Sequence, residues 1–224
     1  MALIVSIETS THVCSVALHR EGHLLAAQTH HEEKSASSLL PGIIEDILHR
    51  AGGHLQDLDA IAVSSGPGSY TGLRIGVSTA KGMAFGLGLP LIGVPSLQAL
   101  ARQVQKKTIG GYFCPMIDAR RMEVYCQLYN GHSLIWDNRP LVVAADSFAD
   151  FSEQPLYLFG DGVMKTKEVL EQPNIVWLPD VSCSAETVGE LAEKRFQQGL
   201  FEDIAYFEPI YLKEFQAKPA KKLL

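Results

Sequence analysis

The stretch LIVSIETSTHVCSVALHREGHLLAAQT, residues 3–29, determines the fold class. It contains three short apolar runs, and Glu21-Gly22 provides a turn between the second and the third. Runs of this length, bounded by polar residues, are typical of strands. We therefore expect strands at 3–7, 13–19 and 23–29. Because short turns join them, they predict an antiparallel meander.

The apolar spacing changes to a helical period after this meander. Ser37 or Ser38 can cap a first helix with Pro41 in its first turn, and Gly52-Gly53 can end it. The elements expected next are a helix at 37–51, a strand at 60–63, a helix at 73–87, a strand at 90–94 and a short helix capped by Ser96. This order, βββαβαβα, is the layout of a ribonuclease H-like lobe, the building block of actin-like proteins.

A smaller second lobe is expected after the polar stretch 103–111. Its expected elements are strands at 113–118, 123–129 and 156–159, a helix at 163–172 and a helix at 185–198 opened by Ser184. The domain division we expect is 1–104 for the first lobe, 105–184 for the second lobe and 213–224 for a tail, with 185–212 able to return to the first lobe. The predicted fold class is a two-lobed, actin-like α/β fold.

Composition places the chain among ordinary soluble proteins. Hydrophobic residues make up 46% and charged residues 20%, and the sequence has neither a membrane-length apolar run nor a secretory leader. We therefore expect a cytoplasmic protein. The net charge of −6 argues against a broad nucleic-acid footprint. The cysteines form no CxxC pair, so they are expected to be reduced, buried thiols: Cys14, Cys114, Cys126 and Cys183.

The first expected helix carries more apolar surface than one sheet requires. Its apolar residues spread over roughly 180° of the helix, whereas a helix on one sheet needs a stripe of about 100°. These residues are Leu39, Leu40, Ile43, Ile44, Ile47 and Leu48. The excess should face a second surface.

The second helix carries small residues at every fourth position. Gly72, Gly76, Ala80 and Ala84 form a track that lets another helix approach closely. Glycine inside a helix costs about 1 kcal/mol against alanine, so its repeated use needs a reason. Two explanations remain open, since both helices can pack under the rest of the chain or can dock another subunit. The partner-binding candidates are Leu39, Ile43, Ile47, Gly72, Leu73, Gly76, Val77, Ala80 and Ala84.

A glycine-rich loop opens this second helix. Its candidate site residues are Gly66, Pro67, Gly68, Ser69, Tyr70 and Thr71, with Arg74 one turn into the helix. Such a loop can point backbone N–H groups at an anion. However, no Lys-Ser/Thr follows in P-loop spacing, and Pro67 removes one donor. The loop is therefore better explained as the hinge that delivers the helix.

Five segments, in order along nearly the whole chain, resemble the TsaB family. They are Ile7-Glu8-Thr9-Ser10 with Cys14–Leu18, Gly66–Gly76, Pro90–Val94, Ile117–Arg120 with Glu123–Tyr125, and Glu208–Leu212. The resemblance implies an actin-like fold and a non-catalytic role in installing threonylcarbamoyl on adenosine 37 of tRNAs reading ANN codons. It also implies docking through the first two helices to TsaD, the catalytic paralogue. A small ATPase, TsaE, joins the assembly, tRNA is met only indirectly, and homodimers form when TsaD is absent.

The resemblance further implies that this chain is not the enzyme. The catalytic paralogue carries a metal-binding His-x-x-x-His after the strand equivalent to 91–94, and here Ser96 and Leu100 occupy those positions. Leucine offers no donor atom to a metal. We therefore expect no metal and no cofactor.

Nucleotide binding is the alternative that the fold class keeps open. Glu8, Thr9, Ser10 and Asp161 match positions that hold nucleotide in actin-like ATPases. The late Gly-Gly that admits adenosine is missing, because the two Gly-Gly pairs, Gly52-Gly53 and Gly110-Gly111, come too early. We interpret the four residues as vestigial. The alternative function is an actin-like ATPase or phosphotransferase with a degenerate site.

Overall fold

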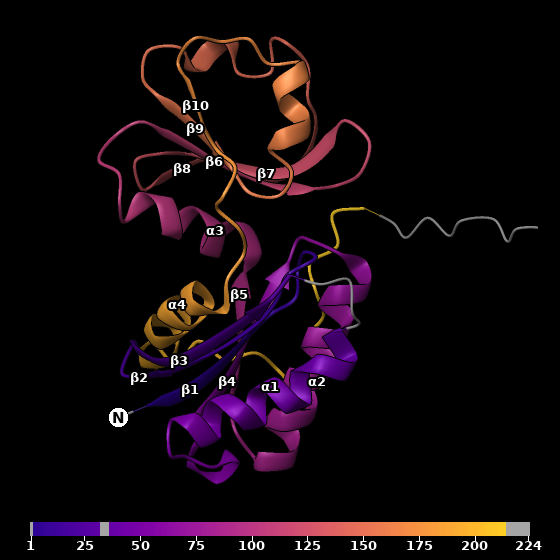
Figure 1. Ribbon diagram of the computed structural model, residues 1–224, viewed down its shortest axis with the longest axis vertical. Helices are drawn as coiled ribbons and strands as arrows, with labels where there is room; N and C mark the ends of the chain where they lie inside the picture. Colours follow the sequence, from indigo (N-terminus) through magenta and orange to yellow (C-terminus); the bar gives the residue numbers. More distant parts are fainter. Residues whose placement is uncertain (1, 32–35, 214–224) are drawn as a thin grey trace, which may run out of the picture.

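The computed structural model describes residues 2–31 and 36–213, which form two lobes, each built on a five-stranded sheet (Figure 1). The first sheet has the order β3-β2-β1-β4-β5. Its strands are β1 (Leu3–Glu8), β2 (Cys14–Arg20), β3 (His23–His30), β4 (Ala60–Gly66) and β5 (Leu91–Pro95). β1 pairs antiparallel with β2 and parallel with β4, so the expected meander and the actin-like α/β fold are confirmed.

Helices cover both faces of the first sheet, which explains why β1 is buried along its whole length. On one face lie α1 (Ala36–Arg50) and α2 (Tyr70–Leu87), and their apolar side chains share a core with the odd-numbered residues of β1. On the other face lies α4 (Ala185–Gln197), which contributes Val188 and Ala192 to a second core. Figure 1 shows α4 and the α1–α2 pair on opposite sides of this sheet.

The second sheet has the order β10-β9-β6-β7-β8. Its strands are β6 (Tyr112–Asp118), β7 (Glu123–Asn130), β8 (Ser133–Val142), β9 (Leu156–Phe159) and β10 (Ile175–Leu178). β8 and β10 are strands that were not expected from the sequence. The helix expected at 163–172 was wrong in length, because only a short 3-10 helix forms at Met164–Glu168. Two further short 3-10 helices lie at Leu55–Asp57 and Ala149–Phe151.

Two of the N-caps expected from the sequence, those of α1 and α3, differ in the structure. α1 begins at Ala36, so Ser37 and Ser38 lie inside its first turn and Pro41 lies in the second. Helix α3 (Ser96–Gln105) has Pro95 as its N-cap, and the Ser96 hydroxyl accepts a hydrogen bond from the Gly66 N–H instead (3.1 Å). The cap of α4 is confirmed, since the Ser184 hydroxyl accepts from the Glu186 N–H.

Helix α3 connects the two lobes. Leu97 and Leu100 pack in one core with Phe113 of β6, whereas Ala99 packs with the α4 side of the first sheet. The Arg102 guanidinium binds the Glu190 carboxylate of α4 at 2.8 Å. The four cysteines are free and buried, as expected, and none of the helices described is long and apolar enough to cross a membrane.

Candidate functional site

The partner-binding residues expected on α1 and α2 are mostly interior residues of the first lobe. Leu73, Ala80 and Ala84 are fully buried, and Val77 is 3% exposed. Ile43 and Ile47 of α1 pack in the same core against the first sheet. The wide apolar face of each helix thus serves the sheet and the neighbouring helix at once, and the assignment of these residues to a docking surface stays a prediction. Leu39 is half-buried and also packs against this core.

The small-residue track on α2 admits the chain that follows β1. A Cβ atom on Gly72 would lie 2.1 Å from the Thr9 carbonyl oxygen, and one on Gly76 would lie 2.2 Å from the Thr9 hydroxyl. The Thr9 hydroxyl donates to the Gly72 carbonyl at 2.8 Å. These two glycines therefore allow an internal contact, and the expectation that they meet another subunit stays a prediction.

The outer face of α2 is different in character. Phe85 is 81% exposed, although phenylalanine usually buries its ring. A Cβ atom on Gly82 or on Gly86 would meet nothing within 4 Å, and the same is true of Gly42 on α1. Ser78, Gly82, Phe85 and Gly86 recur at helical spacing and so share one face. We call these four residues the docking face.

A cleft of about 480 Å³ lies between the lobes. Its walls come from the turn after β1, the glycine loop, the β6–β7 turn, Asp161 and the segment 210–213. The loop residues Pro67 to Thr71 line it, whereas Gly66 is buried against the Ile210 carbonyl. Arg74 lies outside this cleft, where its guanidinium stacks on the Tyr70 ring at 5.2 Å and donates to the Tyr70 hydroxyl at 2.7 Å.

Two of the four vestigial candidates do not line the cleft. Glu8 and Thr9 are buried and do not line it. One Glu8 oxygen accepts hydrogen bonds from the Ser10 N–H at 2.5 Å and from the Ser64 hydroxyl at 3.1 Å. Its burial raises the pKa of the Glu8 carboxyl above the usual range. Glu8 is thus bound within its own lobe.

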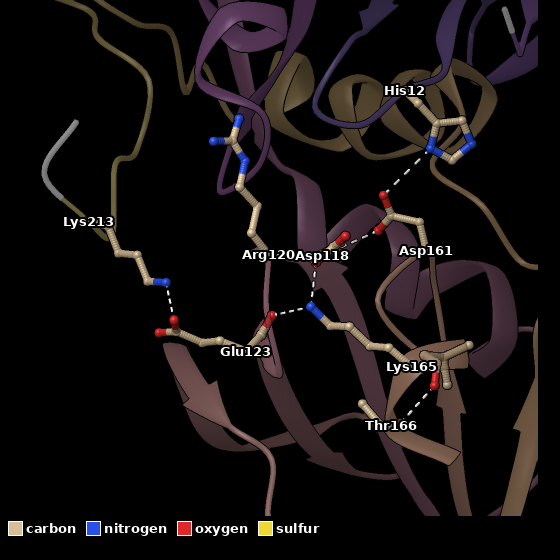
Figure 2. A network of polar contacts seen from close by, with 9 residues as sticks. His12, Asp118, Arg120, Glu123, Asp161, Lys165, Thr166 and Lys213 are labelled. Carbon is tan, nitrogen blue, oxygen red and sulfur yellow. Dashed lines mark hydrogen bonds and ion pairs between the residues drawn. The ribbon is translucent and has the colours of Figure 1, made fainter. Parts of the chain in front are cut away.

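The other two candidates, Ser10 and Asp161, line the cleft from opposite lobes. Asp161 accepts a hydrogen bond from the Asp118 N–H at 3.0 Å, and its other oxygen lies 3.7 Å from the His12 ring (Figure 2). Burial raises the pKa of Asp161, and its contact with His12 opposes that shift. Lys165 binds both the Asp118 carboxylate and the Glu123 carbonyl.

Sequence reasoning identified the Asp118–Arg121 turn but missed its role in the cleft. Arg120 and Arg121 both have positive φ angles, of 67° and 51°, which side-chain-bearing residues rarely adopt. The contacts of this turn with Lys165 and Asp161 join residues more than 40 positions apart. No local pattern signals a pairing of that range.

Two five-stranded lobes around one cleft define the class of actin-like α/β proteins. The ethanolamine utilization protein EutJ from Carboxydothermus hydrogenoformans shares this fold with a TM-score of 0.50 at 11% identity, over 85% of this chain and 88% of that one. YeaZ from Pseudomonas aeruginosa is far more similar, with a TM-score of 0.81 and 27% identity over 95% of this chain and all of that one.

Sequence comparison gives the family. The family model of TsaD, tRNA N6-adenosine threonylcarbamoyltransferase, matches residues 24–221. The tRNA threonylcarbamoyladenosine biosynthesis protein TsaB of Bacillus subtilis is 32% identical over 75% of each chain. TsaB of Escherichia coli is 40% identical over 56% of this chain and 54% of its own length, so that match spans about half of the relative. The chain belongs to the TsaB family.

Proposed function

We propose that the chain is a non-catalytic scaffold subunit that binds a TsaD-like catalytic paralogue. Through that partner it supports threonylcarbamoylation of adenosine 37 in tRNAs reading ANN codons. The observation that carries the proposal is the exposure of Phe85, 81%, between two glycines with open space beside them. The relatives named above as threonylcarbamoyladenosine biosynthesis proteins support the pathway.

The docking face has the features of a protein–protein contact. Buried aromatic anchors dominate the energy of such contacts, and covering a phenylalanine side chain stabilises a complex by about 2 kcal/mol. Gly82 and Gly86 leave the surface flat on both sides of the ring, so a partner helix can approach closely. The same face is self-complementary in principle, and we expect homodimers when the partner is absent.

The cleft supports the non-catalytic part of the proposal. Among the residues described, its lining does not include Glu8, the first-strand acid that an actin-like ATPase would need. Ser96 and Leu100 stand where the catalytic paralogue has its two metal-binding histidines. The Ser96 hydroxyl accepts a hydrogen bond from the Gly66 N–H, and Leu100 is a core residue. The ATP-dependent step then belongs to a TsaE-like ATPase, and tRNA contacts this chain only indirectly.

Gly82→Arg is expected to weaken binding to a co-expressed TsaD-like partner at least about tenfold, because an arginine side chain would stand on the flat face. The free chain should stay folded, since a Cβ atom at this exposed position meets nothing within 4 Å and the longer arginine side chain can extend into solvent. Gln198→Arg, at the exposed C-cap of α4 on the opposite face of the sheet, is the matched control. Affinity is measured by calorimetry or surface plasmon resonance, with melting temperature recorded for each variant.

Undiminished affinity of the Gly82→Arg variant would contradict this docking face. Phe85→Ala provides a second test that removes the anchor without adding bulk, and it should also weaken binding. Sub-millimolar binding of ATP with Mg²⁺ and turnover by the isolated chain would instead favour the actin-like ATPase or phosphotransferase.

A further inference from the structure

The segment 202–213, which we call the C-terminal strap, runs along the first lobe before it reaches the second. It starts at the edge of the first sheet, where the Glu202 N–H donates to the Leu91 carbonyl of β5 at 2.9 Å. Gly93 of the same strand allows this close approach, because a Cβ atom there would lie 2.8 Å from the Glu202 carboxylate. The strap therefore covers an edge strand.

Helix α2 holds the middle of the strap. The Lys81 ammonium donates to the Phe207 carbonyl at 2.9 Å and to the Ala205 carbonyl at 3.3 Å. The Phe207 ring packs against the core beneath α1 and α2. A lysine bound to two carbonyls of an irregular segment fixes the path of that segment, since it satisfies backbone acceptors that lack a sheet or helix partner.

The strap then enters the cleft. The Ile210 N–H donates to the Ser65 carbonyl at the end of β4 at 2.7 Å. The Tyr211 ring lies 5.0 Å from the Tyr70 ring of the glycine loop. Residues 210–213 form part of the cleft wall. Through these contacts the strap is attached to the first lobe as far as Tyr211.

Lys213 crosses to the second lobe. Its ammonium binds the Glu123 carboxylate at the start of β7, and it lies 5.7 Å from the centre of the Tyr125 ring (Figure 2). Glu123 is itself held in place, because Lys165 binds both its carbonyl and the Asp118 carboxylate. Elsewhere in the cleft, His12 of the first lobe faces Asp161 of the second at 3.7 Å. Among the residues described, the Lys213–Glu123 ion pair and the contact between His12 and Asp161 therefore span the cleft.

We propose that the C-terminal strap is a clamp that holds the two lobes closed around the cleft, with Lys213 as its contact to the second lobe. An isolated surface ion pair contributes little, largely because two long side chains must be ordered. Here the strap is anchored through Lys81, Ser65 and Leu91, so only the last two residues need ordering. The closed arrangement then depends on the Lys213–Glu123 ion pair, and either charge of this pair can be reversed without changing a core residue.

Lobe separation in the full-length chain tests the clamp. The native cysteines are buried, so spin labels can be placed on cysteines introduced at exposed His49 of α1 and His132 of the β7–β8 turn. Pulsed electron paramagnetic resonance then gives the distance distribution between the lobes. K213E and E123K should each raise the population at longer distances relative to the closed population by about two- to fivefold. Lys194→Glu, at an exposed position of α4, is the matched control and should leave the distribution unchanged.

The double variant K213E/E123K should restore the closed distribution, because the pair is re-formed with its charges exchanged. An unchanged distribution in both single variants, with native melting temperature, would overturn the proposal. Broadening in K213E that the double variant does not reduce would also overturn it, because the loss would then not act through Glu123.

Discussion

Gly72→Ala is expected to lower the free energy of unfolding by about 2 kcal/mol, whereas Gly82→Ala should raise it by about 1 kcal/mol. Both positions lie in the same helix, α2, and both substitutions add the same methyl group. Intrinsic helix propensity alone would make both variants more stable than the native chain, because alanine is a better helix former than glycine. The opposite signs arise entirely from what surrounds each Cα atom.

At Gly72 the added Cβ atom would lie 2.1 Å from the Thr9 carbonyl oxygen. That oxygen belongs to backbone, so it cannot move without displacing the turn after β1. Gly82 has no atom within 4 Å of an added Cβ, so only the conformational gain remains. Urea unfolding of the three proteins, followed by circular dichroism, gives both changes. Equal stabilisation by the two substitutions would show that α2 does not approach Thr9 in this way.

Glu8→Gln is expected to make the stability of the protein less dependent on pH above about pH 4.5. Burial raises the pKa of Glu8 in the folded chain above its ordinary value. As pH rises through the ordinary value, the unfolded chain loses this proton first, so the native fold loses stability until the folded pKa is passed. Glutamine carries no titrating proton and keeps an oxygen that can accept from the Ser10 N–H and the Ser64 hydroxyl.

The difference in unfolding free energy between the variant and the native chain should therefore grow in favour of the variant as pH rises above about 4.5, and it should level off once the folded pKa of Glu8 is passed. Its slope can reach about 1.4 kcal/mol per pH unit. Asp161, whose pKa is also raised by burial, titrates in both proteins. Urea titrations at four or five pH values provide the curve. A difference that stays constant with pH would mean that folding does not raise the pKa of Glu8.

The strands of the first sheet and the helices beside it were predictable because their apolar residues recur with a clear period. β1, β2 and β4 are buried almost throughout, so they appear in the sequence as compact apolar runs. β8 was missed for the opposite reason. It is an edge strand, largely exposed, and Asp137, Asn138 and Arg139 interrupt any alternation. β10 is also an edge strand and has no buried residue, whereas the equally short β9 is buried at three of its four positions.

The apolar and small residues of α1 and α2 suggested a docking surface, but the sequence did not distinguish their buried residues from their exposed ones. The wide apolar faces of α1 and α2 suggested a surface for a partner. In the structure these faces pack against the sheet, the neighbouring helix and Phe207 of the strap. The spacing of the glycines was ambiguous in the same way. Gly76 and Gly82 look alike in sequence, but Gly76 packs against Thr9 whereas Gly82 faces open space. Which side of a helix meets the sheet depends on its rotation about its own axis, and packing sets that rotation.

The distribution of the four cysteines makes this protein its own reporter of local opening. Cys14 lies in the first sheet, Cys114 and Cys126 lie in the second, and Cys183 lies in the connection that returns to α4. Burial raises the pKa of Cys14 to about 11 and raises that of Cys114 and Cys183 as well, so thiolate is scarce as long as each site stays closed. The order in which an alkylating reagent modifies these thiols records which lobe opens first.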